Sequence, residues 1–229
     1  IAGSVSLEAT GADADIQVNN GITVTGGSVS IQAVDSVIFG LAGADILANG
    51  AGSVTIQSNS DSSDSAGSDS ISMVSGVSID AGSGTITLTS TGSGAGNISL
   101  GLLTTTSSSS TAISVNADNG VSGTIITDIN AGSTNISAVN GGVVLVARSS
   151  IGGTSDATAL EIDAATLDAS NFSNSMFLNL ESDISISNLS VTTQANFIGS
   201  GNITQTGAIV VGALTASLTS GSITLTNTS

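Results

Sequence analysis

Gly27-Ser-Val-Ser-Ile31 and Gly52-Ser-Val-Thr-Ile56 are two copies of one phrase, in which a glycine and a small polar residue precede alternating apolar and hydroxyl residues. An alternation with a period of two predicts a strand with aliphatic side chains on one side and Ser or Thr on the other. A phrase that recurs along a chain is typical of a repeat architecture. Further copies of this phrase begin at Gly3, Gly84, Gly96 and Gly221.

Each repeat contains two more strand-like phrases, such as Asp15-Ile-Gln-Val18 followed by Gly21-Ile-Thr-Val24. Three short strands in a repeat of about 20 to 25 residues predict an all-β fold, a right-handed parallel β-helix whose coils stack at ~4.8 Å. An antiparallel meander stays open, because Asn49-Gly50 and Asn140-Gly141 are also typical of two-residue hairpins. The recurring phrase favours the parallel arrangement. The glycines at the corners, namely Gly21, Gly50, Gly120 and Gly141, are expected to supply positive φ.

The pattern predicts one continuous β-helix over residues 1–229, with loop insertions near residues 58–70 and 104–111. The second of these is the low-complexity run Thr104 to Thr111, which we expect on an outward loop. Residues 157–170 are compatible with a helix, although the alternation around Leu160 fits strands at least as well. The repeat pattern is already present at residue 1 and is still present at residue 227. We therefore expect further coils in a longer chain or filament.

Composition narrows the functional classes. The net charge is −16, from 17 acidic residues and a single basic one, which opposes binding to nucleic acid. No apolar run approaches the ~20 residues of a membrane-spanning helix, so we expect no membrane insertion. Aromatic residues make up 2% of the chain and Cys and His are absent. The core is therefore expected to be narrow and aliphatic, and thiolate and imidazole chemistry is excluded.

Carboxylates are the remaining candidates for chemistry, because two placed carboxylates can cleave a glycosidic bond. Glu161 with Asp163, and Glu181 with Asp183, form pairs two residues apart, which would place each pair on one face of a strand. A solvated outer face is the simpler interpretation of both pairs. Arg148 follows the apolar run 143–146, and we expect a structural role at the outward end of that strand.

Three further patterns can be interpreted either as functional sites or as ordinary structural features. Asp61, Asp64 and Asp69 offer oxygen ligands for Ca²⁺, but they lack the spacing of known calcium loops, and a solvated loop is favoured. Thr-x-Thr pairs, which ice-binding surfaces use, occur at Thr23 and Thr25, at Thr85, Thr87 and Thr89, and at Thr224 and Thr226. Asn-x-Ser/Thr sequons, which also arise from the strand texture itself, occur at Asn97, Asn135, Asn171, Asn188, Asn202 and Asn227. We predict no catalytic, cofactor or metal site.

Residues Gly201 to Leu214, followed by Gly221 to Asn227, resemble the repeat of filamentous-haemagglutinin-type exoproteins. Ala147 to Gly153 with Leu160 to Leu167 is similar to another phrase of those proteins, so the resemblance spans most of residues 140–229. It implies a giant bacterial surface or secreted protein, exported by a two-partner or autotransporter route and used in adhesion or biofilm. The resemblance lies in the repeat pattern, and it assigns a function to no particular residue of this chain.

Together these features predict a structural or adhesive rod, not an enzyme, at the bacterial surface or outside the cell. Its expected partners are further coils of the same chain or identical subunits stacked end to end, and a host or neighbouring-cell surface ligand. Two alternatives stay open: a subunit that polymerises into an extracellular filament, and a carbohydrate-binding or carbohydrate-cleaving β-helix.

Overall fold

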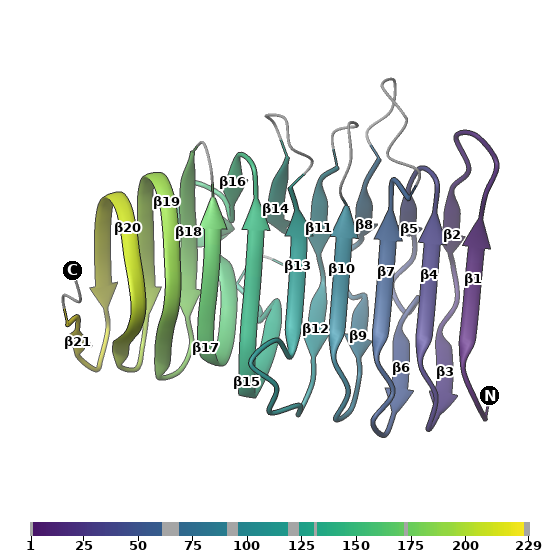
Figure 1. Ribbon diagram of the computed structural model, residues 1–229, viewed down its shortest axis with the longest axis horizontal. Helices are drawn as coiled ribbons and strands as arrows, with labels where there is room; N and C mark the ends of the chain where they lie inside the picture. The colour runs from purple at the N-terminus through teal and green to yellow at the C-terminus, as the bar shows by residue number, and fades with distance from the viewer. Residues whose placement is uncertain are drawn as a thin grey trace.

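The computed structural model describes residues 2–60, 69–90, 96–118, 124–130, 132–171 and 174–226, except the side chains of residues 156 and 171. The strands coil around one long axis to form an elongated body (Figure 1). The early strands are β1 (Val5–Ala9), β2 (Ile16–Val18), β3 (Ile22–Thr25), β4 (Val29–Ala33), β5 (Val37–Phe39), β6 (Ile46–Asn49), β7 (Val54–Ser58), β8 (Ile71–Met73), β9 (Ser78–Asp80), β10 (Ile86–Ser90), β11 (Ile98–Leu100), β12 (Leu102–Thr104), β13 (Ile113–Ala117) and β14 (Ile125–Asp128). The later elements are β15 (Ile136–Ala147), β16 (Ser150–Ile151), the 3₁₀ turn η1 (Asp156–Thr158), β17 (Leu160–Asn171), β18 (Ser175–Leu180), β19 (Ile184–Gly199), β20 (Ile203–Leu218) and β21 (Ile223–Thr224).

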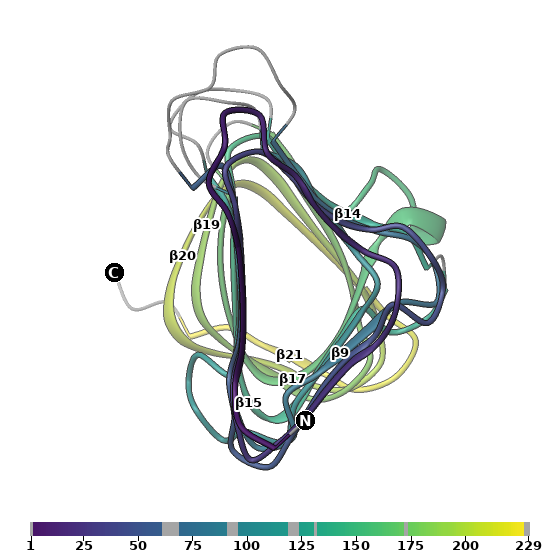
Figure 2. The same cartoon turned by 90° about the vertical axis from the view of Figure 1, so that its right-hand side faces the viewer.

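The predicted parallel β-helix is confirmed. Each strand pairs in parallel with the strand one coil further along, so that the coil has three faces and a triangular outline (Figure 2). Face 1 contains β1, β4, β7, β10 and β13, face 2 contains β2, β5, β8, β11 and β14, and face 3 contains β3, β6, β9 and β12. The chain rises along face 1, crosses over and descends behind while advancing toward the carboxyl end, which makes the coil right-handed (Figure 1).

Coil length varies along the axis. Ser28 lies 24 residues after its partner Ser4, and Thr85 lies 32 residues after its partner Ser53. Toward the carboxyl end the step shortens to 20 residues, as between Ile186 and Thr206. There the long strands β15, β17, β19 and β20 bend from one face to the next, and the coils become rounder (Figure 2).

The core is a set of aliphatic ladders. One ladder on face 1 crosses every coil in parallel register, and its inner members are completely buried, whereas Leu7 at one end is 37% exposed and Ile209 at the other is only partly buried. Because similar aliphatic residues stack on one another from coil to coil, a chain with few aromatic side chains can fill a narrow interior. The ladder consists of Leu7, Ile31, Ile56, Leu88, Val115, Leu145, Ala169, Leu189 and Ile209.

The glycine of the recurring phrase serves close packing between coils. A Cβ on Gly52 would lie 1.8 Å from the carbonyl oxygen of Gly27, one coil earlier, and a Cβ on Gly84 would lie 2.1 Å from that of Gly52. Positive φ is confirmed at the corner residue Gly50, where φ is 106°. The expectation was wrong for Gly21 and Gly141, which do not have positive φ. Gly120 lies outside the described residues.

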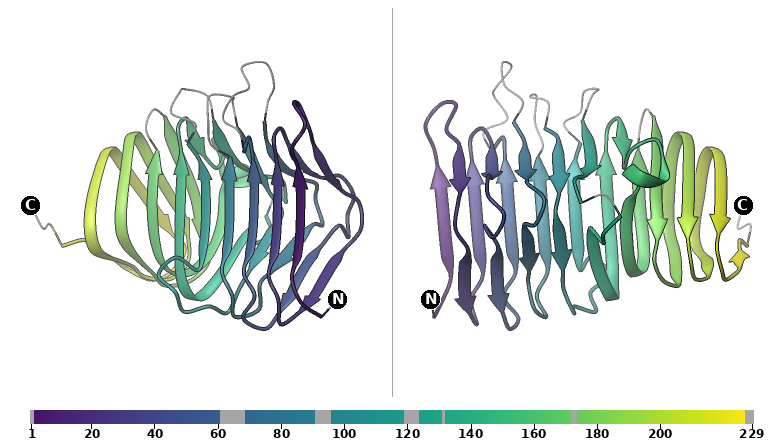
Figure 3. Two further views of the ribbon diagram at one scale, coloured as in Figure 1. Left: turned by 45° about the vertical axis from the view of Figure 1, so that its right-hand side comes forward. Right: turned by 180° about the vertical axis from the view of Figure 1, so that it is seen from behind.

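Two ambiguous segments have defined structures. Residues 157–170, for which a helix was considered, form the end of η1 and then strand β17. The single turn η1 stands out from the back of the coil (Figure 3). Within the run 104–111, which we expected on an outward loop, Thr105 and Ser107 are buried, whereas residues 106, 108, 110 and 111 are exposed. The Thr105 hydroxyl donates to the carbonyl oxygen of Gly84 at 2.5 Å. Of the segment 58–70, residues 61–68 lie outside the described residues.

Candidate functional site

An open groove of about 630 Å³ lies across the last coils of the chain. It runs along the axis, because Glu161, Asn179, Ile198 and Ser217 are consecutive partners in parallel register. Its wall combines apolar side chains such as Leu180 and Ile198 with hydroxyl and amide side chains, and Glu181 adds a carboxylate. The repeat itself therefore builds the groove, since each coil contributes one residue to the same column.

Glu161 is the unusual residue of this groove. Leu160 and Ile162 on either side of it are buried in the core, so the strand alternation turns Glu161 away from the axis. Even so, its side chain is only 1% exposed, and neither carboxylate oxygen has a hydrogen-bond partner among the described residues. The expectation of a solvated outer face was wrong for Glu161, because the residue is buried. Gly132 of the preceding connection and residues 179–181 of the next coil line the groove together with it.

Asn135 joins the coils beneath the groove. Its buried side chain accepts a hydrogen bond from the backbone N–H of Glu161 at 3.0 Å and donates to the carbonyl oxygen of Leu100 at 3.3 Å. It also donates to Asp128 Oδ1 at 2.8 Å. Nearby, the Thr134 hydroxyl donates to Glu181 Oε2 at 2.7 Å. These contacts fix the connection between β14 and β15 against the coil that carries Glu161.

The surroundings of Glu161 disfavour its charged form. Burial is the largest cause and the negative charge of Asp128 is the next, and together they raise the pKa of Glu161 to about 7. Glu181 acts in the same direction, whereas the backbone N–H groups of Glu161 and Gly132 act against it. Within the described ranges no basic side chain lies at the groove, so no cationic side chain there offsets the negative charges of the carboxylates.

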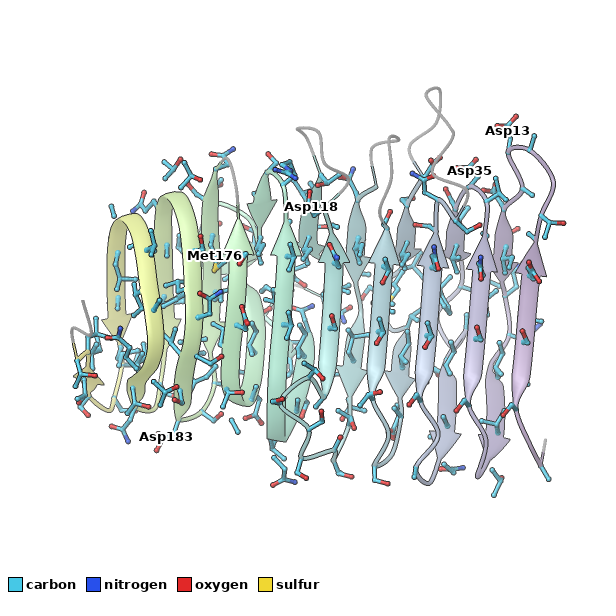
Figure 4. All side chains as sticks on the ribbon, in the orientation of Figure 1. Asp13, Asp35, Asp118, Met176 and Asp183 are labelled. Carbon is cyan, nitrogen blue, oxygen red and sulfur yellow. The ribbon has the colours of Figure 1, made fainter. Side chains whose placement is uncertain are left out.

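The other members of the predicted pairs have ordinary structural roles. Asp163 accepts a hydrogen bond from the Ser182 hydroxyl at 2.6 Å. Asp183 is exposed at the lower edge (Figure 4) and accepts from the backbone and side chain of Asn202, which lowers its pKa. Glu181 and Asp183 precede β19 and do not share a strand face, contrary to the expectation, because a corner falls between β18 and β19.

Arg148 follows the end of β15 and contacts Asp118 on the preceding coil. Its Nη2 lies 2.6 Å from Asp118 Oδ1, and its Nε donates to the same oxygen at 2.8 Å. Asp118 lies on the same edge of the coil as Asp13 and Asp35 (Figure 4). The guanidinium therefore clamps a carboxylate of its own chain, and this contact ties two coils together.

The remaining candidates are spread over the coil. Asp61 and Asp64 lie outside the described residues, while Asp69 is buried. Among the residues that the structure describes, no three His, Cys, Asp or Glu side chains form a group that could hold a metal ion. The Thr-x-Thr pairs do not form one array, because Thr23 pairs with Leu47 on the next coil. Instead, a hydroxyl column runs along face 1 through Ser6, Ser30, Thr55, Thr87 and Ser114.

The sequon asparagines bridge coils. Asn97 accepts from the backbone of Ile125, and Asn188 donates to Asp168. Asn135 and Asn202 make the contacts described above. Asn171 has no described side chain, and Asn227 lies outside the described residues. Four of the six sequons therefore have an asparagine side chain that is already used within the coil.

These features define the class of protein as a parallel β-helix. Comparison of the chain with protein-family models, with curated proteins and with solved structures finds no match. The resemblance to filamentous-haemagglutinin-type exoproteins thus remains a prediction. In the part of the chain that is described, no helix has the length and apolar character needed to cross a membrane.

Proposed function

We propose that the chain is a structural rod of a bacterial cell-surface or secreted protein, which extends or assembles a surface structure. The observation that carries the proposal is the ladder from Leu7 to Ile209, in which each coil presents the same inward position to the next. Such a fold gains length one coil at a time. The location is proposed from the resemblance of residues 140–229.

The surface chemistry supports a rod over a dedicated binding module. Binding hot spots are enriched in Trp, Tyr and Arg. The chain has no Trp or Tyr and one basic residue, and two of its four Phe, Phe39 and Phe197, are buried in the core. The hydroxyl column on face 1 offers regular polar contacts without such anchors.

The groove bears most directly on the alternative of a carbohydrate-cleaving enzyme, because two carboxylates, Glu161 and Glu181, line it. A general acid must come within hydrogen-bond reach of the bond it protonates. The two carboxylate oxygens of Glu161 have almost no exposed surface, so they do not meet this requirement. The geometry therefore supports the rod better than the enzyme.

A binding panel tests the proposal. The immobilised chain is exposed to matrix proteins, mucins and bacterial polysaccharides, and the polysaccharide samples are assayed for released reducing ends. A rod gives no saturable binding and no release. Saturable binding that Asn179→Ala weakens would replace the rod with a ligand-binding module, and release of reducing ends that Glu181→Gln abolishes would replace it with an enzyme.

End-to-end assembly is a second candidate, favoured by the apolar side chains at the two ends of the coil. Leu7 in β1 and Ile223 in β21 are exposed, and the sequence carries no charged residue after Asp183. Charges on strand edges normally oppose pairing between chains. Sedimentation velocity over a concentration series should show association that Ile223→Lys weakens. A concentration-independent monomer would exclude this assembly.

A further inference from the structure

Face 1 carries two columns of outward side chains, which we call the neutral columns. Each of the strands β4, β7, β10 and β13 has five residues, of which the first, third and fifth are buried. The second and fourth residues therefore point away from the axis, and residues 144 and 146 of β15 continue the two columns. The first column is Ser30, Thr55, Thr87, Ser114 and Val144, and the second is Gln32, Gln57, Thr89, Asn116 and Val146.

The neutral columns contain no charged side chain, although the chain has a net charge of −16. Glu8 in β1 and Asp168 in β17 continue the columns at their two ends and mark the limits of the uncharged area. Other carboxylates, such as those of Asp13, Asp35 and Asp118, lie along the edge between faces 1 and 2 (Figure 4). Like charges on two copies of the chain repel each other at that edge, but not across the neutral columns.

The shape of face 1 also suits contact with another sheet. Its early strands run side by side (Figure 1), and they superpose as a nearly straight side of the triangular outline (Figure 2). Two flat sheets with small, uncharged side chains in register can interdigitate closely, and ladders of like residues favour such pairing. Face 2 is narrower, because β5, β8 and β11 have three residues each and present one outward side chain per coil.

We propose that the neutral columns are a lateral docking surface for a second copy of this chain, with face 1 of one copy against face 1 of the other. A second copy has the same coil spacing of ~4.8 Å, so the columns of the two copies match over every coil. The outward side chains include no Trp, Tyr or Arg, which are the usual anchors for a different protein. Val144 and Val146, which are half-buried, add apolar area at one end of the surface.

The size of the surface sets the strength of the pair. A strand of five residues spans ~17 Å, so five strands at ~4.8 Å present about 400 Å² on each copy. A standard stable interface buries about 800 Å² on each partner. The pair is therefore weak for this chain, and each further uncharged coil would add about 80 Å². Such pairing would let rods bundle side by side, and it does not depend on assembly through their ends.

The test uses the whole chain at concentrations up to ~1 mM, which covers the range of weak association. Sedimentation equilibrium gives the association constant, and small-angle X-ray scattering gives the cross-section and length. Thr87→Glu places like charges opposite each other at the middle of the paired faces. Ser72→Glu is the matched control, because it adds the same charge at an outward position of face 2. Thr55→Glu is a second variant of face 1 at an exposed position, and melting curves show that each variant is folded.

The proposal predicts a dimer of larger cross-section and nearly unchanged length, which salt strengthens because it screens the net charge. The association constant should fall at least about tenfold in Thr87→Glu and Thr55→Glu, and stay unchanged in Ser72→Glu and in Ile223→Lys. Three results would overturn the docking surface: a monomer at all concentrations, a dimer of doubled length and unchanged cross-section, or equal losses of association in Thr55→Glu and Ser72→Glu.

Discussion

Ile56 lies directly beside Ile31 in the parallel ladder of face 1, and neither side chain reaches solvent. Thr55, one residue earlier, pairs with Ser30 and is exposed. The two positions therefore separate the inside of the coil from its outside within a single strand. The same alternation repeats at each copy of the phrase.

Replacing Ile56 by Asp should destabilise the coil far more than replacing Thr55 by Asp. Burial of such a side chain contributes ~1.5–3 kcal/mol, and an unpaired buried carboxylate adds a further cost. We expect the free energy of unfolding to fall by at least ~3 kcal/mol for Ile56→Asp and by less than ~1 kcal/mol for Thr55→Asp. Chemical denaturation measures both. Equal losses would contradict the assignment of inward and outward positions.

Much of the fold could be predicted from this alternation. The period of two sets the faces, and the recurrence of Gly-Ser-Val sets the stacking, so the ladder through Val5, Val29 and Val54 agrees with the sequence. The burial of Glu161 could not be predicted. Its position alternates outward like that of any solvated residue, and the residues that line the groove with it, such as Gly132 and Asn179, come from other coils. A local pattern contains no information about such neighbours.

The role of the motif glycine leads to a second prediction. Gly52→Ala should be strongly destabilising, because the added Cβ would lie 1.8 Å from the carbonyl oxygen of Gly27 and the coils would have to separate. Gly21→Ala is the matched control, since its Cβ would meet only ordinary contacts of 3.5 Å or more. Thermal melting of the two variants compares them. Similar melting temperatures would mean that close backbone approach does not explain the glycine.

Asn135 provides a third prediction, because its amide bridges coils in the interior. Asn135→Ala leaves the backbone N–H of Glu161 and the carbonyl of Leu100 without that partner, at a cost of about 1–3 kcal/mol for each buried group. Asn202→Ala removes similar hydrogen bonds that are exposed to solvent and should cost less than ~1 kcal/mol. Urea unfolding of both variants is the measurement. A larger loss for Asn202→Ala would contradict the buried bridge.

A fourth prediction concerns the pH dependence of stability. Because the folded-state pKa of Glu161 is raised from 4.5 to about 7, the folded chain binds more protons than the unfolded chain between these values. The contribution of Glu161 to stability is therefore fully present below about pH 4.5 and is lost as the pH rises through about 7. Glu161→Gln should remove this part of the pH dependence, as measured by unfolding from pH 5 to 8. An unchanged profile in the variant would show that other groups cause it.

The central claim is that consecutive coils are interchangeable units of one rod. Deletion of residues 29–53 tests it, because Val54 then follows Ser28 and takes the place of its register partner Val29. Small-angle X-ray scattering of the wild type and the deletion variant measures the cross-section and the length of each. The account predicts an unchanged cross-section and a rod shorter by about one strand spacing, ~4.8 Å. An expanded cross-section or an unfolded scattering profile would contradict it.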